Sequence, residues 1–488
     1  MQSTILMIFP AVIIILLFIA VILLITFDVV DHTIAALIGA SLAIIYLWQI
    51  WPAWHMHQIE TYTRLANEVG ISTELGIAYL EQAAWYLQNP FFTAEVFGHF
   101  FTEWIDLPTI IVILALMVIT EIAKDSGLFQ FIAVKALSFS KGNPRYLLII
   151  FCAITFLMST VIATTVLIIG PLIILACDAL EQNPTAYLIT TAMCGNVGGI
   201  TTVIASVPTM LVAGVTFYDF LWFATNMLPL GLILLGATIF ISMRIFRRDF
   251  KIPRKSRVND LLALDAWTMV EDRNVFYRTA ILFAAMIIGF IIFGSIGLTW
   301  VVAFVMALLF VLLSGIPSKR IFRDVDWTAL FFFIGLFMIV GCMEEFWVLY
   351  NIGEFVQLIT GGNPALATIT MLWITGLTSG AIDNIPVTAT LIPVARDLAA
   401  FSGRSAAGSI WGALITGAVL GGALTPIASV ANVMTMTVAE RENRPIDYGR
   451  FLRIGVIMFA MFLLVGTGYL LLRLFFFPIP APPNFPGI

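Results

Sequence analysis

The chain has 488 residues, of which 61% are hydrophobic and 11% are charged. Because an average soluble domain is about half apolar and about 25% charged, a soluble fold could not cover this much apolar surface. The net charge is −5, and the basic residues cluster between apolar runs, so the sequence predicts no nucleic-acid partner. Repeated apolar runs of about 20 residues instead predict an all-α polytopic membrane protein in a lipid bilayer.

The first part of the chain contains two apolar segments and then a polar insertion. Residues 5–27 lack a basic n-region and a small-residue cleavage site, so we expect a retained span there and not a cleaved signal peptide. Residues 33–50 predict the second span. Residues 51–107 contain seven acidic residues but only Arg64 as a basic one, together with four tryptophans, which predicts interfacial helices on the non-cytoplasmic face.

The next apolar segments include two that are interrupted by polar or flexible residues. Residues 108–123 predict a third span, whereas residues 146–180 are broken by a run of serine and threonine at 159–165 and predict a helical hairpin. Residues 186–215 contain Asn196-Val197-Gly198-Gly199, which are poor helix formers and predict a broken helix. The long run 220–246 ends in the densest basic cluster of the chain, which marks the cytoplasmic side.

The second part of the chain repeats this order of elements. Its segments are spans at 279–293, 296–314 and 328–346, an interrupted stretch at 364–399, a glycine-broken run at 406–437 and a last span at 454–474. Aligning Pro171 with Pro393 gives an offset of 393 − 171 = 222, and aligning Gly198 with Gly421 gives 421 − 198 = 223. We therefore predict a first repeat at 1–246, a basic cytoplasmic linker at 247–278, a second repeat at 279–474 and a tail at 475–488.

The distribution of basic residues predicts the topology of these repeats. If both interrupted stretches are re-entrant hairpins, each repeat has five spanning helices and one hairpin, so the second repeat is inverted relative to the first. Nearly all basic loops then lie on the cytoplasmic face, and both chain termini are predicted to be non-cytoplasmic. If both hairpins crossed the membrane fully, the basic segments 244–278 and 319–323 would face the opposite side.

Broken helices free backbone groups that can replace the water shell of an ion near the bilayer midplane. Asp383 is the most specific candidate for an ion-binding or coupling residue, because a carboxylate at membrane depth usually pairs with a cation or titrates. Its alternative role is to cap the following half-helix, and for each glycine the alternative is close helix packing. The predicted ion or substrate ligands are Ser159, Thr164, Thr165, Asn196, Gly198, Gly199, Thr201, Thr202, Asp383, Asn384, Thr388, Gly421, Gly422, Thr425 and Asn432.

Four stretches carry a resemblance to a known superfamily: EIAKDSGLFQFIAVK at 121–135, GNVGGITT at 195–202, SGAIDNIPVTATLIP at 379–393 and LGGALTPIASVAN at 420–432. They resemble the ion transporter superfamily, in the branch of arsenite/antimonite permeases, NhaD sodium/proton antiporters and the melanosomal P protein, with its citrate-transporter-like domain. The resemblance implies a homodimer that moves ions or small anions by an elevator-like motion. The chain departs from it at the first hairpin tip, where Val161-Ile162 stand in place of an Asp-Asn pair.

These features predict a secondary active permease or antiporter for an ion or small anion in the plasma (inner) membrane. Na⁺ or H⁺ is the expected coupling ion, and no other cofactor or resident metal is expected. The alternatives are efflux of an organic anion or of arsenite, and a non-transporting scaffold subunit that binds a partner through the insertion 51–107. An enzyme is not expected, because the sequence has no nucleotide-binding loop, nucleophile elbow or H-E-x-x-H motif.

Overall fold

The fold is given by a computed structural model that describes residues 12–21, 24, 31, 33–46, 104–161, 165–250, 266–346, 356 and 358–483. Every regular element within these residues is a helix, as the apolar periodicity predicted. Most of the insertion 51–107, the predicted ligand Thr164 and residues 251–265 of the linker 247–278 lie outside the described residues.

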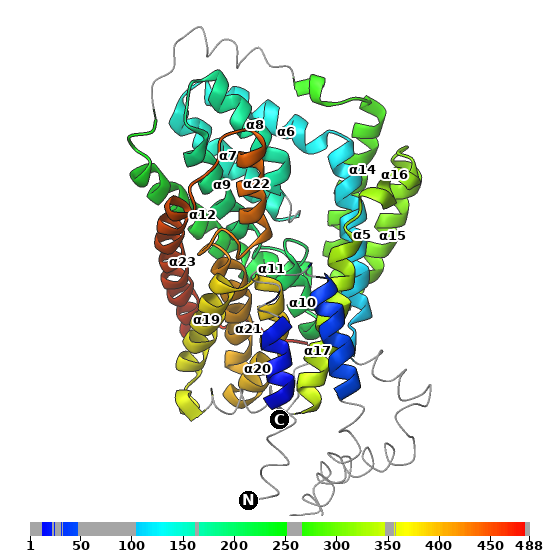
Figure 1. The fold of residues 1–488 in the computed structure, drawn as a ribbon, viewed down its shortest axis with the longest axis vertical. Coiled ribbons are helices and arrows are strands. Elements are labelled where there is room, and N and C mark those ends of the chain that lie inside the picture. The colour runs from blue at the N-terminus through cyan, green and yellow to red at the C-terminus, as the bar shows by residue number, and fades with distance from the viewer. Residues whose placement is uncertain are drawn as a thin grey trace, which may run out of the picture. The chain divides into compact units, whose positions relative to one another are not determined.

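The described helices of the first repeat follow the predicted order (Figure 1). Two short apolar helices at Val12–Val21 and Thr33–Tyr46 come first. The labelled helices are α5 (Leu107–Asp125), α6 (Leu128–Leu137), α7 (Pro144–Ser159), α8 (Thr165–Ala179), α9 (Pro184–Gly198), α10 (Val207–Thr216), α11 (Phe220–Asn226) and α12 (Leu228–Ile245).

The second repeat contains the matching helices. Short 3-10 turns occur in the first repeat at η1 (Ser138–Ser140), in the linker at η2 (Ala266–Met269) and in the second repeat at η3 (Gly294–Ile296). Its helices are α14 (Arg273–Phe293), α15 (Thr299–Leu313), α16 (Ser318–Asp324), α17 (Trp327–Glu345), α19 (Pro364–Ala381), α20 (Asn384–Ser402), α21 (Arg404–Gly421), α22 (Val430–Arg441) and α23 (Tyr448–Phe476).

The basic stretch between the third predicted span and the first predicted hairpin, where the sequence predicts no helix, forms a helix. This helix, α6, buries Phe129, Ala133 and Val134 and contacts α7 and α8. Its lysine, Lys135, stays exposed. A short amphipathic helix of this kind is hard to separate from a loop by hydropathy alone, because its one buried face is narrow.

An asparagine–proline pair starts three of the helices and explains where they begin. Asn143, Asn183 and Asn363 each accept a hydrogen bond from the backbone N–H two residues later, at 2.9 to 3.0 Å. The proline that follows each asparagine occupies the first turn, where its missing N–H costs nothing. Asn143 and Asn363 lie 363 − 143 = 220 positions apart, so the two hairpins begin with the same local signal.

The chain divides into two compact units. The smaller unit contains the described parts of Met1–Ile110 and Trp327–Ile352, and within it the Thr33 hydroxyl donates to the Thr328 carbonyl at 2.8 Å. The larger unit contains Ile111–Asp326 and Gly353–Ile488, and therefore both predicted hairpins and both predicted broken helices. The candidate site lies entirely within this larger unit.

Within the larger unit, the helix that follows the break in each repeat (α10 or α22) packs against helices of the other repeat. In Figure 1, α22 of the second repeat lies beside α8 and α9 of the first, while α10 of the first repeat contacts α20 and α21 of the second. The repeat-equivalent pairs α7 with α9 and α19 with α21 also pack against each other. This reciprocal packing brings the breaks of both repeats to one place, as expected of paired structural repeats.

Several described helices are long and apolar enough to cross a membrane. Five meet that condition, namely α5, α12, α14, α20 and α23, and the number rises to seven if each of the bent pairs α10–α11 and α16–α17 forms one span. The bend between α10 and α11 is 114°. The predicted count of five spans and one re-entrant hairpin per repeat remains a prediction.

Candidate functional site

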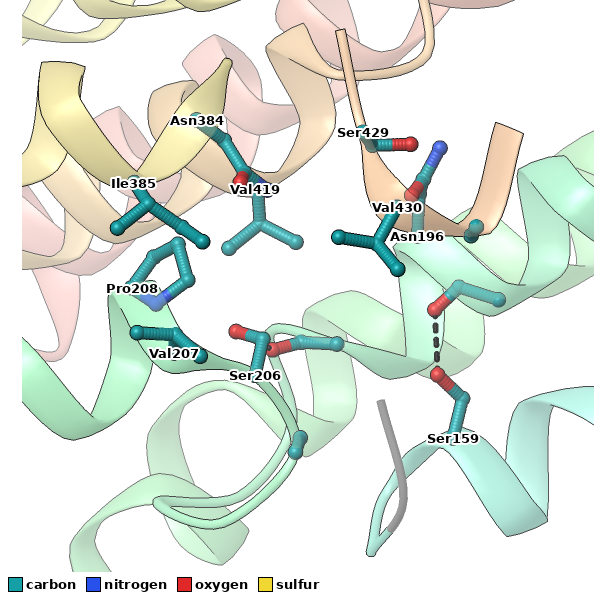
Figure 2. Close-up of a pocket in the computed structure, with 14 residues that line it drawn as sticks. Ser159, Asn196, Ser206, Val207, Pro208, Asn384, Ile385, Val419, Ser429 and Val430 are labelled. Atoms are coloured by element: carbon teal, nitrogen blue, oxygen red, sulfur yellow. Dashed lines mark hydrogen bonds between the residues drawn. The ribbon is translucent and has the colours of Figure 1, made fainter. Parts of the chain in front are cut away.

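A pocket of about 60 Å³ lies where the breaks of the two repeats meet (Figure 2). Its lining comes from the ends of six helices and from the chain that joins them. The lining residues are Ser159, Gly195, Asn196, Gly199, Ala205, Ser206, Val207, Pro208, Asn384, Ile385, Val419, Ser429, Val430 and Ala431. None of these residues has an ionisable side chain, so the polar character of the pocket comes from hydroxyls, amides and backbone groups.

Two serines related by the repeat begin the half-helices on either side of the pocket. Ser206 precedes α10 and Ser429 precedes α22, at a separation of 429 − 206 = 223 positions. Ser206 Oγ donates to the Gly199 carbonyl at 2.8 Å, and Ser429 Oγ accepts from the Asn432 N–H at 3.3 Å. Each serine thus fixes the chain on one side of its break, and the N-terminus of the next helix points toward the pocket.

A pair of buried asparagines joins the two repeats beside the pocket. Asn196 Nδ2 donates to Asn432 Oδ1 at 3.2 Å. Asn432 Nδ2 in turn donates to the carbonyls of Gly422, at 2.7 Å, and Thr425, at 2.8 Å. Asn432 is fully buried, and its side chain provides a hydrogen bond to the Gly422 carbonyl at the break and a second one to the Thr425 carbonyl, which also accepts from the Ala428 N–H at 3.4 Å.

Asp383 lies at the tip of the second hairpin, directly before the pocket residue Asn384. Its Oδ1 accepts from the Ile385 N–H at 2.8 Å, which makes it the N-cap of α20, and its side chain is half-buried. The Thr388 hydroxyl donates to the Asn384 carbonyl at 2.6 Å within the same helix. The capping role considered in the sequence analysis is therefore present, and it places Asp383 directly before a residue that lines the pocket.

The C-terminal end of α7 accepts a hydrogen bond from the break of its own repeat. The Thr202 hydroxyl donates to the Thr160 carbonyl. The repeat-equivalent hydroxyl of Thr425 is buried and has no hydrogen-bond partner within the described part of the chain. The two halves of the site therefore differ in their polar contacts as well as in sequence.

Comparison with known proteins places the chain in a family. The sequence profile described as "Citrate transporter" matches residues 21–417. The chain belongs to the citrate transporter family. It is 31% identical over 378 residues to an uncharacterized transporter of Mycobacterium tuberculosis, covering 76% of this chain and 87% of that protein. The human P protein is 26% identical over 452 residues, which cover 76% of this chain and 54% of the P protein.

Two solved transporters share the fold. The YdaH transporter of Alcanivorax borkumensis aligns with a TM-score of 0.57 and 14% identity, covering 80% of this chain and 91% of that one. MtrF of Neisseria gonorrhoeae, described as one of a class of antimetabolite efflux pumps, aligns with a TM-score of 0.57 and 13% identity, covering 81% and 88%. The predicted superfamily and the expectation of a transporter and not an enzyme are confirmed by this family membership.

The structure brings together four of the predicted ligands in the lining of the pocket, namely Ser159, Asn196, Gly199 and Asn384. Ser159 Oγ donates to the Gly195 carbonyl at 2.7 Å, as the dashed line in Figure 2 shows. The other described candidates do not line it. These are Thr165, Gly198, Thr201, Thr202, Asp383, Thr388, Gly421, Gly422, Thr425 and Asn432.

Several lining residues were not among the predicted ligands. Figure 2 shows Ile385 and Pro208 close together at one side of the pocket, with Val430 and Asn196 toward the other. Apolar residues of this kind carry no chemical signal in the sequence. The serine pair could have been found, because Ser206-Val207-Pro208 and Ser429-Val430-Ala431 match at the repeat offset.

Gly198 and Gly421 allow close packing of helices beside the pocket. A Cβ at Gly198 would lie 2.7 Å from the Phe156 carbonyl oxygen of α7. A Cβ at Gly421 would lie 2.5 Å from the Gly376 oxygen and 2.8 Å from Ser379 Cβ, both on α19. The packing alternative therefore accounts for these two glycines, since a larger residue would push apart the helix pairs that hold the breaks.

Gly421→Ala is expected to lower the free energy of unfolding by about 1 to 3 kcal/mol, because the added methyl group meets backbone that cannot move aside. Gly236→Ala is the matched control, since a Cβ at Gly236 in α12 meets nothing within 4 Å. The control should be neutral or slightly stabilising, because alanine favours a helix over glycine. Denaturant titration of the purified protein measures both, and equal effects would contradict the packing role.

Proposed function

We propose that this protein is a secondary active transporter of a small anion, driven by a Na⁺ or H⁺ gradient, with its substrate site in the pocket between the two repeats. The leading alternative for the cargo is an inorganic cation. Family membership supports transport, and the name of the family supports an organic acid anion such as citrate.

The observation that supports an anion as the transported substrate is that three helix N-termini lie at the pocket. Helices α10, α20 and α22 begin at Val207, Asn384 and Val430, and all three residues line the pocket. The N-terminus of a helix carries a partial positive charge and unpaired N–H groups, both of which favour an anion. Because the lining has no basic side chain, these N-termini and the hydroxyl and amide groups would provide the anion's hydrogen bonds.

Asp383 is the proposed coupling residue. Its side chain is half-buried, and it directly precedes Asn384, which lines the pocket. A bound Na⁺ or a proton would neutralise its carboxylate. Neutralising this charge lowers the repulsion that an incoming anion meets. The cation gradient and the anion would thereby be linked at one hairpin tip, whereas the first hairpin has Val161-Ile162 at the corresponding positions.

The membrane arrangement that fits this function is the one predicted from the basic loops. It consists of two inverted repeats, each with one re-entrant hairpin, in a plasma-membrane protein whose termini are both non-cytoplasmic. A homodimer working by an elevator-like motion, and a partner at the insertion 51–107, remain part of the proposal. The second candidate is efflux of an organic anion or arsenite, and the described role of MtrF as an efflux pump supports testing it.

Flux into proteoliposomes tests the proposal. Radiolabelled citrate should accumulate inside vesicles when a Na⁺ or H⁺ gradient is imposed, and should not accumulate when the gradient is collapsed by an ionophore. Arsenite is tested in parallel in both directions, so that export of arsenite without citrate uptake would favour the efflux candidate. Absence of flux for every anion and cation tested, together with a stoichiometric partner in mild detergent, would instead favour the scaffold hypothesis.

A further inference from the structure

The short helix α11 is held at its C-terminal end by side chains from the last helix. Tyr469 Oη donates to the Asn226 carbonyl at 2.6 Å. Arg473 Nη2 donates to Asn226 Oδ1 at 2.5 Å. Asn226 is 4% exposed, so both bonds are formed in a largely buried setting where they contribute more than at the surface.

The segment after α23 holds the N-terminal end of the same helix. The Pro480 carbonyl accepts hydrogen bonds from Tyr218 Oη, at 3.0 Å, and from Trp222 Nε1, at 3.3 Å. The Tyr218 and Trp222 rings are stacked, with centroids 3.6 Å apart. The neighbouring Ile479 is 1% exposed, and its backbone lies so close to Gly408 of α21 that a Cβ there would collide with the Ile479 carbonyl.

Within the described part of the chain, the hydrogen bonds of Arg473 all go to neutral acceptors. Its Nε donates to the Phe477 carbonyl at 2.8 Å and its Nη1 to Tyr469 Oη at 3.2 Å, in addition to the bond to Asn226. Among the described residues no carboxylate lies within ion-pair distance of Arg473. The guanidinium therefore serves as a three-point connector between the end of α23, the segment after it and α11.

Residues 217–219 connect α11 to the end of α10, so a displacement of α11 acts on that end of α10. The connection includes Phe217, which has a left-handed backbone (φ 57°), and the N-cap Asp219, which accepts from the Trp222 N–H at 2.7 Å. Helix α10 has 10 residues, or about 15 Å at 1.5 Å per residue, and its first two residues line the pocket. A shift of α11 would therefore be transmitted through a short rigid helix to the substrate site.

We infer that Tyr469, Arg473 and the Pro480 carbonyl form a C-terminal clamp that positions the pocket wall provided by α10, and that Arg473 is a positioning residue for substrate binding. The inference that binding is affected rests on the proposed function. The inference that α10 is held from the C-terminal segment does not, and it can be tested without a substrate. None of the three clamp groups lines the pocket.

Hydrogen–deuterium exchange of the full chain in lipid nanodiscs tests the clamp directly. Arg473→Gln should accelerate exchange about tenfold or more in peptides covering α10 and α11, because bonds to a charged donor are lost. Asn226→Ala should give the same pattern, and Arg473→Lys should fall between Arg473→Gln and wild type. The matched control is Arg453→Gln, an exposed arginine at the other end of α23, which should leave these peptides unchanged.

The clamp is rejected if Arg473→Gln changes exchange only in 469–483, changes it equally in every helix, or leaves α10 at the wild-type rate. Citrate uptake adds a functional measurement. The apparent KM of Arg473→Gln should rise several-fold while Vmax stays within about twofold, and an unchanged KM would overturn the link to binding. If wild-type vesicles carry none of the anions tested, the proposed function fails, whereas the exchange comparison still decides the clamp.

Discussion

Asp383→Asn is expected to abolish gradient-driven uptake while the protein remains folded. Asparagine is as good an N-cap as aspartate, so the hydrogen bond from the Ile385 N–H can be kept. What is lost is the negative charge that a Na⁺ ion or a proton would neutralise. The substitution therefore separates the capping role from the coupling role, and citrate accumulation should fall to the level of vesicles without protein.

The control for this substitution is Asp272→Asn. Asp272 is also an N-cap, accepting from the Asn274 N–H at 2.7 Å at the start of α14, and it does not line the pocket. Its asparagine variant should transport like wild type. Asp383→Ala is informative as well, because it removes both the charge and the cap and should lower stability in addition to flux. Gradient-driven uptake by Asp383→Asn at the wild-type rate would remove Asp383 from the coupling mechanism.

The helices and their breaks could largely be predicted from the sequence, because apolar length and helix-breaking residues are local signals. The hairpin at 364–399 appears as two helices separated by Ile382 and Asp383, and the break after Asn196 begins at Gly199. The exchange of α10 and α22 between the repeats could not be predicted in this way. It depends on packing between residues at least 384 − 216 = 168 positions apart, which no local pattern encodes.

The sequence predicted the lining residues most successfully where a polar residue lies at a break between two helices. Asn196 and Asn384 were named from the sequence and line the pocket. Val419 lines it too, and it lies 419 − 196 = 223 positions after Asn196, so the repeat places an apolar residue opposite a polar one. From the sequence alone such apolar positions are assigned to helix packing, because an isolated valine in an apolar helix has no other distinguishing feature.

Asn432 shows how a correctly chosen residue can have a different role from the one predicted. It was proposed as a ligand, and its position in a break justified that choice. Both of its Nδ2 hydrogens are already donated to backbone carbonyls, and its Oδ1 accepts from Asn196. A side chain with its donors used in this way is better suited to hold the two repeats together than to bind a substrate.

Asn432→Ala should accordingly be one of the most destabilising single changes in the chain. It removes the donor from the Gly422 carbonyl and the acceptor from one Asn196 hydrogen, and it leaves the Thr425 carbonyl with only its 3.4 Å bond from the Ala428 N–H. Each buried group that loses its partner costs about 1 to 3 kcal/mol. We expect the free energy of unfolding to fall by about 3 kcal/mol or more. Denaturant titration of the purified protein in detergent measures this loss, and transport by the variant should fall with it.

The same substitution at an exposed helix cap provides the comparison. Asn363 caps α19 on the surface, and Asn363→Ala should cost about 1 kcal/mol. A double-mutant cycle between Asn196→Ala and Asn432→Ala should give a coupling energy of about 0.5 kcal/mol or more, because the two side chains bond to each other. If Asn432→Ala costs no more than Asn363→Ala, or if the two substitutions are additive, the asparagine pair does not join the repeats. The pocket would then need another structural basis, because its two walls belong to different halves of the chain.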